Sequence, residues 1–344
     1  MAREALVKWS LKYHDGTRSE PRMDDEVGSL GSMIAYYLQP MAHRGFSAYN
    51  VCKSLLMSVP QRRRWLQEAL QAVASAPTES QLLQAALTVL RAHSPAGGDV
   101  GEEEGEEEEE HLLRTFEEIQ YLIEDLDNAN NLIPMNGVEV IASYLDHKKQ
   151  SLVRSSCELI ATATQNNPKT QEAFLAMLPR LLTILNDRSY PSSVGVKAVY
   201  AVSCMTRSYT PGVERLLSLD GLATLRLCLG ADDTKMVVKT LFILMSYFSP
   251  AQGEVRGRLV AELPTLVPEL VSLVRAGGSD EVKGHALSTL VTMATHHQEA
   301  VLECGKEEVG LKSALTDLAE IWSSEEHEEE LRDIKRLLDT CFTA

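Results

Sequence analysis

The sequence has 344 residues, of which 44% are hydrophobic, and a formal net charge of −16. This composition allows a substantial buried core, and the acidic balance disfavours binding to nucleic acid or to anionic membrane surfaces. No stretch of about 18 apolar residues occurs that could span a membrane, and the N-terminus lacks the uninterrupted apolar segment of a secretory signal.

The N-terminal part of the chain shows few helical signals before residue 57. We expect residues 1–20 to be a flexible segment, and residues 21–56 carry no clear periodicity, so no order is predicted for them. N-terminal helices are predicted for residues 57–93, where apolar residues recur every three or four positions. Residues 94–111 are predicted to be an acidic linker, because eight glutamates lie in the run Glu102–Glu110 and such like-charge blocks are usually solvated loops.

From residue 112 to 344 the sequence repeats. Four dipeptides, each a valine followed by a basic residue, mark helical runs at spacings of 43, 42 and 44 residues: Val153-Arg154, Val196-Lys197, Val238-Lys239 and Val282-Lys283. Self-similarity at about 40–47 residues is typical of helical solenoids of the armadillo type. Such a solenoid acts by presenting a long surface, so we expect a docking face instead of a reaction pocket.

Each repeat follows one internal pattern. Every marker begins a helix that is apolar on nearly all sides, as in residues 196–205 and 238–248, and such a helix is covered by its neighbours. A proline or, in the fourth repeat, His296-His297 then begins the next helix, and a second, shorter helix closes the unit. A charged last helix, about 325–342, is predicted to cap the array. No strand alternation of useful length occurs, so the predicted fold is all-α: an armadillo-like repeat solenoid of about four repeats plus helical caps.

The six cysteines lie singly along the chain and form no close pair. This arrangement suits a reducing compartment better than a disulfide framework. Together with the absence of a signal or a membrane span, it predicts a cytoplasmic protein, which we expect to be a monomer.

Residues for catalysis are not evident. The sequence contains no phosphate-binding loop, dinucleotide fingerprint or nucleophile elbow. His296 and His297 are adjacent and cannot face one metal from a helix, and His327, among Glu325, Glu326 and Glu328, indicates a solvated helix start. We therefore expect neither an enzyme nor a metal or cofactor site.

Superposing the repeats predicts a row of partner-binding residues on the concave side of the array. The first rung holds Gln120, Glu158, Tyr200 and Phe242, Glu124 and Thr162 lie one turn further, and Lys197 and Lys239 lie nearly one turn earlier. A mixture of acidic, basic and aromatic residues is typical of a protein-docking face. In the alternative interpretation, Tyr200 and Phe242 belong to the core and the lysine stems only cover apolar surface.

Four segments in the same order resemble the Hsp-binding-protein/Fes family of nucleotide exchange factors: Arg62–Leu70, Phe116–Asn131, Val196–Cys204 and Leu337–Phe342. The resemblance covers residues 57–342, and the segment from Leu6 to Ser10 is similar to the family's N-terminal segment. Residues 20–56 depart from the family and are interpreted as an insertion. The family consists of armadillo-like cochaperones of cytosolic heat-shock protein 70.

The resemblance implies that the protein grips the ATPase domain of heat-shock protein 70 on its concave face and accelerates ADP release. It further implies that the N-terminal segment, with Leu6, Val7, Trp9 and Leu11 as its peptide-like part, helps to displace clients. The alternatives are a loosely docked amphipathic helix for that segment and, for the whole chain, a general armadillo scaffold that binds an extended peptide. Such a scaffold would carry Trp and Asn repeated along the ladder, and neither recurs in register.

Overall fold

A computed structural model describes residues 77–94, 105–249, 255–276, 278–322 and 325–342, together with Arg64. The chain divides into two compact units, Met1–Pro77 and Thr78–Ala344, and nearly all of the described residues lie in the second. The predictions for residues 1–20 and 21–56, for most of 57–76 and for residues 95–104 lie outside the described residues.

The second unit begins with two helices, α5 (Glu79–Ala92) and α6 (Glu106–Leu122). A capping box begins α5, because the Thr78 hydroxyl accepts from the Gln81 amide at 3.2 Å and the Thr78 amide donates to the Gln81 side chain at 2.8 Å. The prediction of an acidic linker up to residue 111 was wrong at its C-terminal end, because α6 already begins at Glu106.

The glutamates of α6 favour the helix for two reasons. Four of them lie in its first turn, where negative charge complements the helix dipole. In addition, Glu109 accepts a hydrogen bond from Ser151 and pairs with Lys149 at 3.3 Å, and these contacts lower the pKa of the Glu109 carboxyl. A run that reads as a solvated loop is therefore partly fixed by tertiary contacts.

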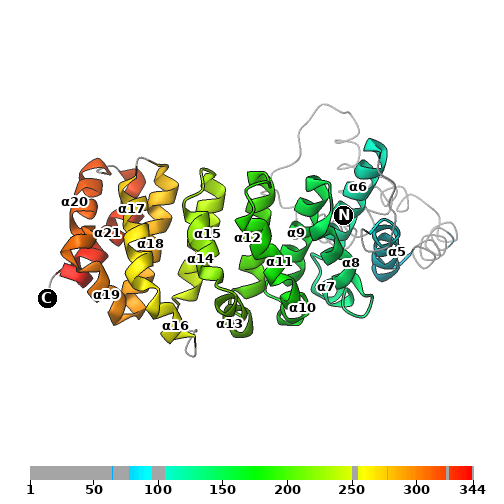
Figure 1. The fold of residues 1–344 in the computed structure, drawn as a ribbon, viewed down its shortest axis with the longest axis horizontal. Coiled ribbons are helices and arrows are strands. Elements are labelled where there is room, and N and C mark those ends of the chain that lie inside the picture. The colour runs from blue at the N-terminus through cyan, green and yellow to red at the C-terminus, as the bar shows by residue number, and fades with distance from the viewer. Residues whose placement is uncertain are drawn as a thin grey trace, which may run out of the picture. The chain divides into compact units, whose positions relative to one another are not determined.

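After α6 the chain forms three-helix units that follow one another in a row (Figure 1). Each unit has two short helices and one long helix, and the last unit ends the array. The units are α7 (Leu126–Asn131), α8 (Gly137–Ser143) and α9 (Gln150–Thr164); α10 (Pro168–Phe174), α11 (Leu178–Asn186) and α12 (Ser192–Thr206); α13 (Thr210–Ser218), α14 (Gly221–Leu229) and α15 (Thr234–Tyr247); α16 (Arg256–Ala261), α17 (Leu263–Arg275) and α18 (Asp280–His296); α19 (Gln298–Cys304), α20 (Leu311–Ile321) and α21 (Glu328–Phe342).

Short 3-10 turns lie between or before some of these helices, at Tyr144–Asp146, Leu175–Met177, Glu307–Val309 and Glu325–His327. The described residues contain no strand. The predicted all-α, armadillo-like fold is thus confirmed, and each valine-base marker lies within the first two turns of α9, α12, α15 or α18. None of the helices within the described ranges is long and apolar enough to cross a membrane.

Several turns between helices share a left-handed backbone conformation. Asn166 and Ser208 have φ of 53° and 55° at the corner after α9 and after α12, and Asn136 and Asp220 have φ of 51° and 55° just before α8 and α14. Asn and Asp tolerate this left-handed conformation better than most residues. Equivalent corners therefore recur, one repeat apart for Asn166 and Ser208 and two repeats apart for Asn136 and Asp220.

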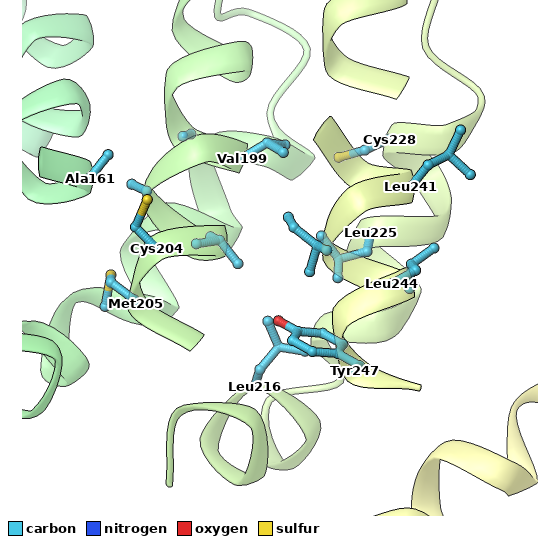
Figure 2. Close-up of a cluster of buried hydrophobic side chains, with 14 of the residues drawn as sticks. Ala161, Val199, Cys204, Met205, Leu216, Leu225, Cys228, Leu241, Leu244 and Tyr247 are labelled. Carbon is cyan, nitrogen blue, oxygen red and sulfur yellow. The ribbon is translucent and has the colours of Figure 1, made fainter. Parts of the chain in front are cut away.

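The core runs through the whole stack. Each long helix contacts the next, from α6 through α9, α12, α15 and α18 to α21. Figure 2 shows one part of it, where side chains of α12 such as Val199 share a buried cluster with Leu225 of α14 and Tyr247 of α15. The Tyr247 hydroxyl lies 2.6 Å from the Thr206 hydroxyl, which in turn donates to the Val202 carbonyl at 2.7 Å. Tyr247 therefore donates to Thr206, and the buried pair is satisfied.

Candidate docking face

Seven of the eight predicted partner-binding residues lie on the long helices α6, α9, α12 and α15, and Glu124 follows the end of α6. We call the set Gln120, Glu124, Glu158, Thr162, Lys197, Tyr200, Lys239 and Phe242 the ladder face. All of them are at least partly accessible to solvent, and Glu124 and Phe242 are exposed. These side chains are held within reach of a partner by helices whose opposite sides are buried.

The structure joins the ladder face across neighbouring helices. Lys197 of α12 pairs with Glu158 of α9, and Lys239 of α15 lies with its Nζ 4.4 Å from the ring centroid of Tyr200 on α12. Each lysine reaches back to the residue 39 positions earlier. This offset equals the 42-residue repeat period less the roughly three residues of one helical turn, because the lysine and the residue that it contacts come from rungs one turn apart.

Gln120 also contacts a neighbouring rung. Its side-chain amide donates to Thr162 of α9, which lies one turn beyond Glu158, the residue with which the sequence groups it. As with the lysines, this contact joins two rungs that are one turn apart. Glu124 lies beyond the helix, because α6 ends at Leu122.

Tyr200 is half-buried and is held from two sides. Its hydroxyl donates to the Gln165 side chain at 3.2 Å, while the Lys239 ammonium covers one ring face. Burial, then the nearby Cys204 thiol, raise the pKa of the Tyr200 phenol, and burial, then repulsion from Lys197, lower the pKa of the Lys239 ammonium. The lysine is thus partly desolvated before any partner arrives.

Phe242, one unit later, is also covered by a cation, which here comes from the preceding unit and not from the following one. Its side chain is 39% exposed, and the Arg207 guanidinium carbon lies 5.2 Å from its ring centroid. The end of α12 that carries Arg207 is fixed by Gln171, whose Nε2 donates to the carbonyls of Cys204 at 2.7 Å and Arg207 at 3.2 Å. The alternative that Phe242 is core is wrong, and Tyr200 is only partly buried.

Sequence reasoning missed Arg207 because it follows the last residue of α12. The periodicity held a signal for it, since Gln165 and Arg207 are 42 residues apart and each contacts the aromatic residue 35 positions later, Tyr200 and Phe242 respectively. A second ion pair, from Arg154 to Glu158 at 3.6 Å, completes the charged surroundings of the face.

The remaining candidates have structural roles. His297 is buried and bonds the Phe248 carbonyl through Nε2 at 3.1 Å, and His327 stacks on Trp322 with ring centroids 4.7 Å apart. Asn128, which follows the first long helix, donates to the Leu122 carbonyl at 3.0 Å. Within the described ranges, no group of three or more His, Cys, Asp or Glu is placed to hold a metal ion.

Solved structures with the same fold include designed armadillo repeat proteins. A designed armadillo repeat protein superposes with a TM-score of 0.58 and 17% identity over 75% of this chain and 99% of its own. SYS-1 superposes with a TM-score of 0.52 and 13% identity over 76% of this chain and 48% of its own. At these identities the likeness concerns the fold alone.

Sequence comparisons are more specific. The family model of the SIL1/FES1/HPBP1 C-terminal domain matches residues 128–248, and the model of the nucleotide exchange factor Fes1 matches residues 4–132. Hsp70-binding protein 1 of Homo sapiens is 31% identical over 290 residues, which cover 83% of this chain and 79% of that protein. The Hsp70 nucleotide exchange factor fes-1 of Neurospora crassa is 34% identical over 149 residues, 43% of this chain and 56% of its own. The chain therefore belongs to the family of Hsp70-binding protein 1 and the nucleotide exchange factor Fes1.

Proposed function

We propose that this chain binds the ATPase domain of a heat-shock 70 protein through the ladder face and accelerates the release of ADP. The observation that carries the proposal is the match to Hsp70-binding protein 1 along 83% of the chain, together with the match to the Fes1 model. The activity needs no bond-making residue, so it is compatible with a protein that is not an enzyme. We place it in the cytoplasm, where the family's partner is expected.

Exchange of this kind is a coupling between two binding equilibria on the partner. A protein that binds preferentially to the conformer with separated lobes weakens nucleotide binding by the same factor. A hundredfold effect requires a differential binding free energy of about 2.7 kcal/mol. A stack of packed helices can supply this, because it holds its contacts at fixed spacing and does not adapt to the closed conformer.

The ladder face offers suitable contacts. Two aromatic rings, each covered by a cation, alternate with an ion pair along α9, α12 and α15. Four basic residues lie along these helices, with Arg154 and Lys197 paired to Glu158, Lys239 on the ring of Tyr200 and Arg207 on the ring of Phe242. On a chain of net charge −16 this basic group would attract an acidic patch of the partner, and the aromatic and Arg side chains are the usual anchors of such interfaces.

The direct experiment measures nucleotide release. A heat-shock 70 ATPase domain is loaded with a fluorescent ADP analogue, and its release is followed with and without this protein. We expect acceleration that saturates with concentration. An unchanged release rate at saturating protein would refute the proposal and leave the armadillo scaffold that binds an extended peptide.

A double substitution tests the face itself. Lys197→Glu with Tyr200→Ala should abolish acceleration while the circular dichroism spectrum stays helical. A matched control is Lys148→Glu with Leu227→Ala, which makes the same kinds of change at exposed positions outside the ladder face. If the first variant still exchanges, or if both variants lose activity equally, the ladder face is not the binding surface.

For the N-terminal segment we propose a separate role in client release, through Leu6, Val7, Trp9 and Leu11. Deleting residues 1–20 should leave ADP release unchanged and slow the release of a bound client peptide. Equal loss of both activities would contradict a separate role.

A further inference from the structure

The C-terminal unit brings together two cysteines that are far apart in the sequence. Cys304 is the last residue of α19, and Cys341 lies in the last turn of α21. The two helices contact each other, and a Cβ atom on Gly305 would lie only 3.5 Å from the Cys341 carbonyl oxygen. The backbones are therefore in direct contact next to the two cysteines, and each thiol shifts the pKa of the other.

The two thiols differ in exposure and acidity. Cys304 is fully buried, whereas Cys341 is half-buried. The interaction with Cys304 lowers the pKa of the Cys341 thiol, and the interaction with Cys341, followed by burial, raises the pKa of the Cys304 thiol. Reactivity requires the thiolate and access to it, so this pair combines an accessible nucleophile with a protonated partner behind it.

The other described cysteines lack both features. Cys157, Cys204 and Cys228 are buried, and burial raises the pKa of their thiols to about 12, 11 and 11 respectively. Among the five cysteines in the described part of the chain, only Cys341 is accessible. Oxidation should therefore be selective for one position.

We propose that Cys341 and Cys304 form a redox-modification site, which a peroxide converts to an intramolecular disulfide between α21 and α19. The Cys341 thiolate attacks one oxygen of hydrogen peroxide, the O–O bond breaks, and the departing hydroxide takes up a proton as water. The Cys304 sulfur then attacks the resulting sulfenic acid, the S–O bond breaks, and a second water leaves with the Cys304 proton. The two thiols lose two electrons in total, and the peroxide gains them.

The bond has a structural consequence because α21 is lightly anchored. Of its residues, Ile334 and Leu337 alone are fully buried. A covalent link at its C-terminal end would prevent α21 from separating from α19, so local opening of the terminal unit becomes rarer. A dithiol reductant reverses the bond by exchange.

Peptide mapping tests the site. The full chain is treated with hydrogen peroxide, alkylated and digested with trypsin, which cuts after Lys283, Lys306 and Arg336. We expect peptides 284–306 and 337–344 to be joined, to separate with dithiothreitol, and to stay unlinked in Cys341→Ser. Oxidation of Cys341 to the sulfinic acid with Cys304 still reduced, or a link from Cys341 to Cys52, would overturn the proposal.

Hydrogen exchange tests the consequence. The amides of α21 should exchange more slowly in the oxidised chain than in the reduced chain, by a factor of at least about 10. Peroxide-treated Cys304→Ser and Cys304→Ala serve as controls and should show no such slowing. Unchanged exchange in α21 after the bond has formed would refute the stabilising role.

Discussion

The helices α12 and α21 occupy the same position in their units and have the same length of 15 residues, yet they are held very differently. In α12 eleven residues are buried, because α9 and α15 cover it on two sides and α11 and α13 cover more of it. In α21 two residues are buried, and its first turn consists of glutamates. A central helix therefore packs its buried side chains against the units on both sides. The terminal helix packs against the preceding unit alone and exposes its other side to water.

This difference in burial gives the central helices and the terminal unit distinct roles. Most of the ladder face lies on α9, α12 and α15, each of which packs against a long helix on both sides, so its side chains are held in fixed positions. The terminal unit can open without disturbing them, because in a stacked array each unit contacts only its neighbours. Four substitutions test this contrast, and they follow in order of expected effect.

The largest effect is expected from Met205→Ala in α12. Met205 is fully buried, so the substitution leaves a cavity between packed helices and should lower the free energy of unfolding by about 2–5 kcal/mol. Urea unfolding followed by far-ultraviolet circular dichroism measures it. A cost below about 1 kcal/mol would show that α12 is not the rigid centre described here.

In the cap, Ile334→Ala should act locally. Ile334 is also buried, but α21 can detach on its own, so its amides should exchange about 30-fold faster while the global urea midpoint moves less than in Met205→Ala. Native-state hydrogen exchange read by peptide separates the two effects. Equal shifts of the global midpoint in both variants would remove the distinction between centre and cap.

A smaller effect is expected from Tyr247→Phe, at the seam between α12 and α15. The hydroxyl of Tyr247 is lost, but Thr206 still donates to the Val202 carbonyl, so no donor is left without a partner. The cost should be about 1 kcal/mol in urea unfolding. Thr206→Val is the complementary variant, and a double substitution whose cost equals the sum of the single costs would indicate that the two hydroxyls do not interact.

The smallest effect is expected on the pH dependence of stability, through His297 at the junction of α18 and α19. Burial and then the nearby Arg256 lower the pKa of His297, against the raising effects of the Phe248 carbonyl and Glu299. The unfolded chain therefore takes up a proton first as pH falls, and the stability that neutral His297 contributes above its unfolded pKa of about 6.5 is lost below it.

Thermal melts at about pH 7 and about pH 5 measure this contribution. The melting temperature of His297→Gln should fall less between these values than that of the unsubstituted chain, since the side-chain amide of the variant cannot titrate. His296→Gln, at the exposed neighbouring position, is the control and should change the pH dependence less than His297→Gln, because His296 makes only the smallest contribution to the pKa of His297. If the two variants behave alike, His297 is not the group responsible.

The sequence predicted the long helices well, because a segment that is apolar on nearly all sides recurs with nearly constant spacing, and a buried helix tolerates few polar residues. It predicted the short helices less sharply, since α7 and α10 have six and seven residues and are too short for a periodic signal. Their positions depend on corners such as Asn166 and Ser208, whose left-handed conformation leaves only a weak trace in the sequence.

Contacts between units were the hardest to predict. Pairing of Gln120 with Thr162, and of Arg207 with Phe242, depends on how far one helix is shifted along the next. Sequence spacing fixes this shift only to within about one turn. The contact of Cys304 with Cys341 lay beyond reach for another reason, because the terminal unit has no valine-base marker to set its register.

The backward reach of Lys197 and Lys239 has a mechanical consequence. Each ammonium lies against a residue of the preceding unit, so a torsional motion that rotated one unit against the previous one would pull Lys197 from Glu158 or Lys239 from the ring of Tyr200. The contacts of the two lysines therefore oppose twisting of one unit against the next. A force applied at one rung is therefore transmitted to the next unit. A bound protein that twisted the array would have to displace several units together.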